Sequence, residues 1–133
     1  MAAFDPLAAK SEADAILEDA AQRLHQLLRE AVRHLDPFPP YPGAFFTYAI
    51  EVEAPGAEPL GRGCIVLAPD GELYELQIGQ EVPLLPEDVA DPVAMRREEL
   101  KVLDSLHPRD YILYAYNALV KVTELLLERG GER

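Results

Sequence analysis

The sequence predicts a single α+β domain with the element order α-βββ-α-α, in which helices pack on one face of a three-stranded antiparallel meander. Apolar residues recur at helical spacing in both end regions, whereas the stretch 44–79 alternates with a period of two. Prolines and glycines separate the two kinds of pattern. The 133 residues suffice for one core in one domain, 1–133, and we expect flexible ends at 1–10 and 130–133.

The first helix is predicted over 11–35. Ser11 has the character of an N-cap, with Asp14 three residues later in the position usually taken by Glu. One face of this helix is apolar, formed by Ile16, Leu17, Ala20, Leu24, Leu27, Leu28, Ala31 and Leu35. Four prolines between 36 and 43 then end the helix and predict an extended spacer, which Phe38 and Tyr41 attach to the core.

Three strands are predicted over 44–52, 62–68 and 72–79. Pro69-Asp70-Gly71 is typical of a tight turn between the second strand and the third. On the third strand the alternation places Tyr74, Leu76 and Ile78 on one face, and we expect the helices to cover such an apolar face. A three-stranded sheet has two open edges, which proteins usually cover or pair.

Two further helices are predicted. The first spans 91–106, with Asp91 as N-cap and Pro92 at the first helical position. The second spans 108–129 and is apolar around most of its circumference, apart from a narrow polar sector of Asn117, Lys121, Glu124 and Glu128. Such a helix needs cover on several sides, either from its own chain or from a second copy.

The composition limits the classes of partner. Twelve basic and twenty-four acidic residues give a net charge of −12, which repels nucleic acids and anionic membrane surfaces. Solubility is the simplest reason for this charge, and attraction to a basic protein is the alternative. The single Cys64 forms no internal disulfide, and the chain carries no expected leader or membrane span, which favours the cytoplasm.

Residues typical of catalysis or metal binding are scarce. No Gly-rich nucleophile motif, paired His or Cys ligands, or calcium-loop spacing is present, so we expect no metal and no cofactor. The residues that remain as low-ranking ligand-binding candidates are His107, Arg109, Asp110, Tyr111 and Tyr114 around the start of the final helix, with Tyr48 and Tyr74 from the sheet. The interpretation as an interhelical corner, with capping residues and packed tyrosines, is the one that the sequence favours.

The sequence leaves function as a choice between two main hypotheses, and an enzyme that uses His107 and a tyrosine is a third, lower-ranking one. The first is a non-enzymatic homodimeric interaction, adaptor or chaperone-like protein, supported by the apolar final helix, the open sheet edges and the acidity. A helix followed by a meander is similar in outline to the small acidic secretion chaperones, although two further strands expected after the middle helix are absent. The second hypothesis is a small-molecule binding domain with a tyrosine-lined pocket between the sheet and the final helix.

Overall fold

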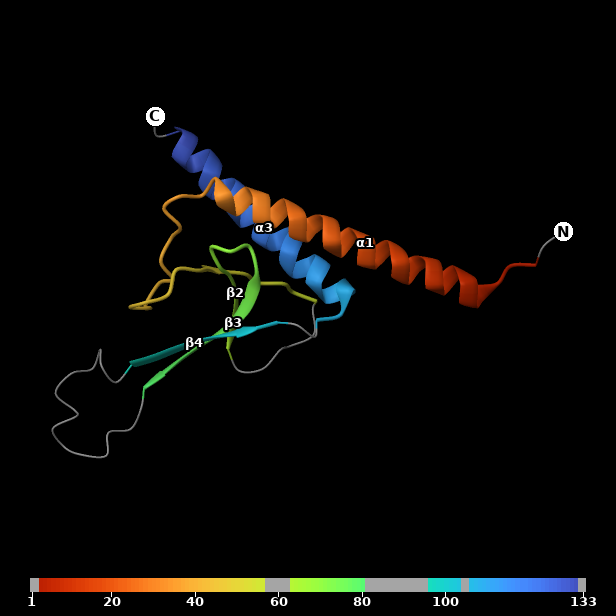
Figure 1. The fold of residues 1–133 in the computed structure, drawn as a ribbon, viewed down its shortest axis with the longest axis horizontal. Coiled ribbons are helices and arrows are strands. Elements are labelled where there is room, and N and C mark those ends of the chain that lie inside the picture. The colour runs from red at the N-terminus through yellow and green to blue at the C-terminus, as the bar shows by residue number, and fades with distance from the viewer. Residues whose placement is uncertain (1–2, 57–62, 81–95, 104–105, 132–133) are drawn as a thin grey trace.

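The computed structural model describes residues 3–56, 63–80, 96–103 and 106–131. These residues form the helices α1 (Pro6–Arg33) and α3 (Pro108–Gly131) and the strands β1 (Ile50–Glu51), β2 (Cys64–Leu67), β3 (Leu73–Gln80) and β4 (Arg96–Val102). The strands make one antiparallel sheet in the order β1-β2-β3-β4, and the helices lie side by side on one side of it (Figure 1). The α+β class is confirmed, whereas the three-stranded meander and the order of elements need correction.

The helix predicted over 91–106 is wrong in its described part, which contains β4. Seven residue pairs join β4 to β3, from Tyr74 opposite Val102 to Gln80 opposite Arg96. The segment does alternate, since Glu98, Leu100 and Val102 share one face while Glu99 and Lys101 lie on the other. A short stretch with few apolar residues is compatible with both the helical period of 3.6 and the strand period of two. Here pairing along β3 stabilises the strand conformation.

The residues on the face of the sheet that the helices cover differ from those predicted. Ile65, Leu67 and Leu73 face the helices and join the main core, together with residues of both helices. Tyr74 and Leu76, which we expected beneath the helices, lie on the opposite face and pack with Ala49, Val66, Tyr41 and Cys64 in a second, smaller cluster. We call this second side the outer face of the sheet.

The segment between α1 and β2 is folded back on itself rather than forming the strand predicted over 44–52. Only Ile50 and Glu51 pair as a strand, and a single bridge joins Pro40 to Tyr48. Gly43 turns the chain with a φ of 86°, a left-handed conformation that glycine adopts without strain. Phe38 is buried in the main core, so the prediction that it attaches the proline-rich spacer is confirmed.

The first helix begins earlier than predicted, at Pro6. Asp5 is its N-cap, because the Asp5 carboxylate accepts hydrogen bonds from the amides of Leu7 and Ala8, at 3.0 and 3.3 Å. Pro6 occupies the first helical position, where its missing N–H is not needed. Ser11, the predicted cap, therefore lies inside the helix.

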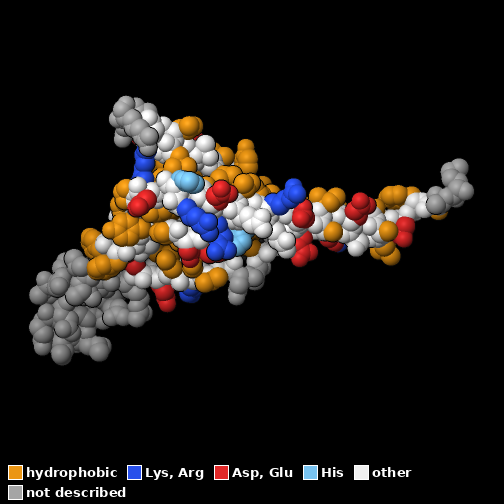
Figure 2. Space-filling view, turned by 45° about the horizontal axis from the view of Figure 1, so that its top comes forward, with side chains coloured by type: hydrophobic (Ala, Val, Ile, Leu, Met, Phe, Trp, Pro, Cys, Tyr) orange, Lys and Arg blue, Asp and Glu red, His pale blue; other side chains and the backbone are white. Residues whose placement is uncertain are grey.

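The two halves of α1 have different surroundings. The second half packs on α3, and Leu28 and Val32 are the buried residues of the helix. The first half, residues 6–20, which we call the arm, projects away from the rest of the described chain (Figure 2). The side chain of Ile16 on the arm is 61% exposed, and that of Phe4, which precedes the arm in the chain, is 80% exposed.

The final helix, predicted over 108–129, is confirmed as α3 and is buried along one side by its own chain. Tyr114, Ala115, Ala118 and Val122 are buried in the main core. A second apolar side remains exposed and includes Leu113, Tyr116, Val120 and Leu127. The described chain thus covers part, but not all, of the apolar circumference.

The polar sector of α3 covers the edge of the sheet at β1. The Asn117 side-chain amide donates a hydrogen bond to the carbonyl of Glu53, and the Lys121 ammonium donates to the carbonyl of Glu51, both at 2.8 Å. These carbonyls, two residues apart, are the ones an added strand would use. The β1 edge is therefore closed by side chains of the same molecule.

Candidate functional site

Three side chains from different elements meet beside the base of the arm. His25 lies on α1, Glu72 follows the turn between β2 and β3, and Tyr111 lies in the first turn of α3. The His25 Nε2 lies 2.6 Å from Oε1 of Glu72, and the Tyr111 ring meets the imidazole edge to face, with 6.3 Å between ring centroids. With Ala21 and Gln22 they line a surface cavity of about 210 Å³.

The hydroxyl of Tyr111 is the unusual group of this cluster. It is buried and has no hydrogen-bond partner among the described residues. Burial, and secondly the negative charge of Glu72, raise the pKa of Tyr111 to about 12. The phenol therefore keeps its proton at neutral pH and can donate it to a hydrogen-bond acceptor, which would relieve a cost of about 1–3 kcal/mol.

The cluster has the chemistry to hold a small polar group. The Glu72 carboxylate fixes the orientation of the His25 ring, and the Tyr111 hydroxyl adds a hydrogen-bond donor. No local pattern predicts this pairing, because His25 and Glu72 are 47 residues apart in the chain. Only Tyr111 of the three stood among the predicted site residues.

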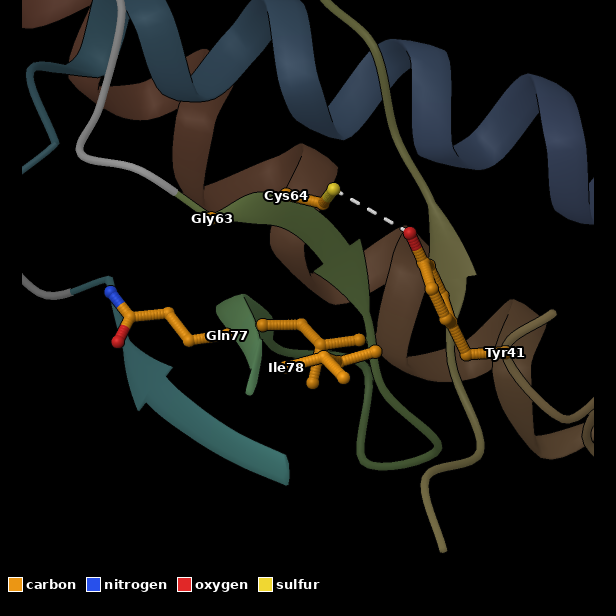
Figure 3. Close-up of a pocket in the computed structure, with 6 residues that line it drawn as sticks. Tyr41, Gly63, Cys64, Gln77 and Ile78 are labelled. Atoms are coloured by element: carbon orange, nitrogen blue, oxygen red, sulfur yellow. Dashed lines mark hydrogen bonds between the residues drawn. The ribbon is translucent and has the colours of Figure 1, made fainter. Parts of the chain in front are cut away.

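A second cleft, of about 400 Å³, lies on the outer face of the sheet (Figure 3). The Tyr41 hydroxyl points toward Cys64 and donates a hydrogen bond to its Sγ over 3.5 Å. This bond, and secondly burial, raise the pKa of Tyr41 to about 12. Gly63, Gln77 and Ile78 belong to the same lining. The described lining carries no positive charge of the kind that activates a thiol, so we assign no chemistry to Cys64.

A pair of exposed phenylalanines, Phe45 and Phe46, is held by hydrogen bonds to Glu98 of β4. The Glu98 carboxylate accepts hydrogen bonds from the amides of Phe45 and Phe46, at 2.6 and 3.0 Å, and from the Thr47 hydroxyl at 2.6 Å. The two phenyl rings meet edge to face, and Phe46 is 62% exposed. One carboxylate on β4 therefore fixes a loop that presents apolar rings to the surface.

The predicted residues around the start of α3 form a local cap. The carbonyl of His107 accepts hydrogen bonds from the amides of Asp110 and Tyr111, and Nδ1 of His107 accepts one from the amide of Arg109. The Arg109 guanidinium lies 3.7 Å from the buried Asp110 carboxylate. This arrangement matches the corner interpretation; whether these residues bind a ligand stays a prediction.

The four tyrosines proposed to line one pocket lie in different places. Tyr114 is buried in the main core, where burial raises its pKa, and Tyr111 belongs to the cluster with His25. Tyr74 lies on the outer face, where a hydrogen bond from its hydroxyl to Asp70 raises its pKa to about 12. Tyr48 is exposed on the folded-back segment beside Pro40. They therefore do not line a common pocket between the sheet and α3.

Within the described ranges no three His, Cys, Asp or Glu side chains gather in a way that could hold a metal ion. None of the described helices has the length and apolarity needed to cross a membrane. Comparisons with protein-family models, with curated proteins and with solved structures found no match for the chain.

Proposed function

We propose that the chain is a non-enzymatic, homodimeric interaction module of the cytoplasm, with an adaptor or chaperone-like role. The observation that carries the proposal is the arm, a helical segment with apolar side chains that the described chain does not cover. α1 has 28 residues and is therefore about 42 Å long, yet its buried residues lie only in its second half.

Helices in proteins take most of their stability from tertiary packing rather than from intrinsic propensity. The arm continues α1 beyond its packed half and has little such packing among the described residues. The Asp5 cap and the ion pair between Lys10 and Asp14 support the arm, but exposed pairs of this kind contribute only about 0.3–0.5 kcal/mol. A partner that packs on the arm would supply the missing contacts.

The charges of the arm indicate what kind of protein that partner is. Glu12, Asp14, Glu18 and Asp19 outnumber Lys10 along the arm. Acidic flanks beside Ile16 and Leu17 complement an amphipathic helix with basic flanks. We therefore propose a basic, helical segment of a protein as the target of the arm.

A synthetic amphipathic helix with leucines on one face and lysines beside them tests this target. Fluorescence anisotropy should show binding to the wild-type protein that weakens with salt and is lost in Ile16→Glu, while the free energy of unfolding changes by less than about 0.5 kcal/mol. Gln26→Glu, an exposed change in the packed half of α1, is the matched control and should bind as wild type. Equal binding by Ile16→Glu would remove the arm from the proposal.

A second candidate function is the binding of a small polar molecule, and the unpaired Tyr111 hydroxyl favours it. The ligand would contact His25, Glu72 and Tyr111 in the 210 Å³ cavity. Native mass spectrometry separates the two functions, because a dimer without added mass supports the interaction module. A monomer with a reproducible extra mass that disappears in Tyr111→Phe supports the binding site instead.

A further inference from the structure

We propose that β4 is the dimer interface: its outer edge, which no other described strand pairs, forms an antiparallel pair with β4 of a second copy, across a two-fold axis at Leu100. The two sheets then form one continuous sheet. This inference rests on the proposed homodimer and adds to it the surface, the strand register and the charges that select them.

The two edges of the sheet differ in what covers them. At β1, side chains of α3 already bind the carbonyls of Glu51 and Glu53. At the opposite end, β4 pairs with β3 alone within the described part of the chain. An uncovered strand edge is a template for another strand, and a second copy is a partner that always carries a matching one.

The hydrogen-bond pattern identifies the backbone groups that an added strand would meet. The amide of Leu103 donates to the carbonyl of Leu73, so Leu103 directs its backbone groups toward β3. Direction alternates along an antiparallel strand. Glu98, Leu100 and Val102 therefore direct their amides and carbonyls away from β3, and only registers that place these residues opposite one another let two β4 edges bond.

The charges of the neighbouring residues select one of these registers. With the axis at Leu100, Glu99 of each copy lies opposite Lys101 of the other, and both side chains are exposed. Moving the axis to Arg97, Glu98, Glu99 or Lys101 places like charges directly opposite each other, and moving it to Val102 leaves only residues 101–103 to pair within the described segment. Opposite charges across a strand pair stabilise it and like charges destabilise it, so the axis at Leu100 is favoured.

The outer face supplies apolar contacts in this register. Leu100 and Val102 lie on that face, and Val102 is 64% exposed. The pairing places Val102 opposite Glu98 of the second copy, whose carboxylate holds the exposed Phe45 and Phe46. Association therefore brings two exposed apolar patches together as well as two strand edges.

Charge variants at this edge provide the test, read by native mass spectrometry and light scattering over a range of concentrations. Glu99→Lys opposes lysines of both copies and should raise the dimer Kd by about tenfold or more. Mixing Glu99→Lys with Lys101→Glu should restore a mixed dimer, because each lysine then faces a glutamate. Glu51→Lys makes the same charge change at the covered β1 edge and should leave the dimer unchanged.

Leu100→Pro is the second variant. It removes an amide that points away from β3, which an edge strand tolerates, and should give folded monomers by circular dichroism and light scattering. A wild-type dimer that persists in Glu99→Lys and Leu100→Pro overturns the β4 interface but leaves the homodimer. A wild-type monomer at all concentrations overturns both. Weakening by Glu99→Lys without rescue in the mixture overturns the register.

Discussion

The two edge strands of the sheet carry the same kind of backbone groups but differ in what covers them. At the β1 edge, Asn117 and Lys121 of α3 bind outward carbonyls of Glu53 and Glu51. At the β4 edge, the described chain offers no such cover, and the outer face beside it carries exposed apolar side chains. Side chains that close one edge disfavour strand addition there, which is why we place the proposed partner at the β4 edge, where the described residues provide no such cover.

The difference also explains the narrow polar sector of α3. Asn117 and Lys121 are one helical turn apart, and the carbonyls that they bind are two strand residues apart. A turn of helix rises about 5.4 Å and two strand residues about 6.6 Å, so the two spacings nearly match. Two residues of this polar sector, Asn117 and Lys121, are therefore hydrogen-bond donors whose spacing matches that of the carbonyls at the strand edge.

The largest expected effect comes from removing the packing that joins the β1 edge to the rest of the sheet. Leu67 is fully buried and lies opposite Ile50 in β1 and Leu73 in β3. Leu67→Ala should lower the free energy of unfolding by about 2–5 kcal/mol, measured by urea denaturation. Leu127→Ala removes the same atoms from a side chain that is 72% exposed, and a loss as large there would contradict this account of the core.

An intermediate effect is expected when the covered edge is opened. Asn117→Ala combined with Lys121→Ala removes both donors and should cost about 1–3 kcal/mol of stability. The opened β1 edge should also allow species larger than a dimer, visible by light scattering. Thr123→Ala, which removes a hydroxyl bonded to the carbonyl of Leu119 within α3, should do neither. A double variant that keeps its assembly state would show that the edge is blocked by something else.

The smallest effect is expected from alkaline titration on the outer face beside β4. The folded-state pKa of Tyr74 is about 12 against an ordinary 10.0, because its hydroxyl donates to Asp70. A raised pKa disfavours the ionised form in the folded protein, so its contribution is complete below pH 10 and is lost between pH 10 and 12. Tyr74→Phe should make the decline of unfolding free energy in that window shallower, and an unchanged decline would argue against the bond.

Much of the fold followed from local sequence, and the exceptions have physical causes. α3, β2 and β3 begin and end close to the predicted residues, because caps, prolines and alternation agree there. The segment 96–102 was predicted as a helix because Leu100 and Val102 fit a loose helical stripe as well as an alternation. Its state is decided by β3, a partner that no local pattern contains.

The candidate site was less predictable than the fold, since it depends on contacts between distant segments. His25 approaches Glu72 only because Gly71 lets the turn between β2 and β3 lie against α1, where an added Cβ would be 2.8 Å from the Cα of Arg29. The sequence showed that Pro69-Asp70-Gly71 is a turn, but not which helix it meets. The open edges were expected, but which one is covered required the positions of Asn117 and Lys121.

Hydrogen exchange of the β4 amides, resolved by NMR, tests the difference between the edges most directly. The amides of Glu99 and Lys101 point toward β3 and should be protected at every protein concentration. The amides of Leu100 and Val102 should be protected in the dimer and exchange rapidly after dilution to the monomer. Rapid exchange of these two amides in a protein shown to be dimeric would contradict pairing at β4.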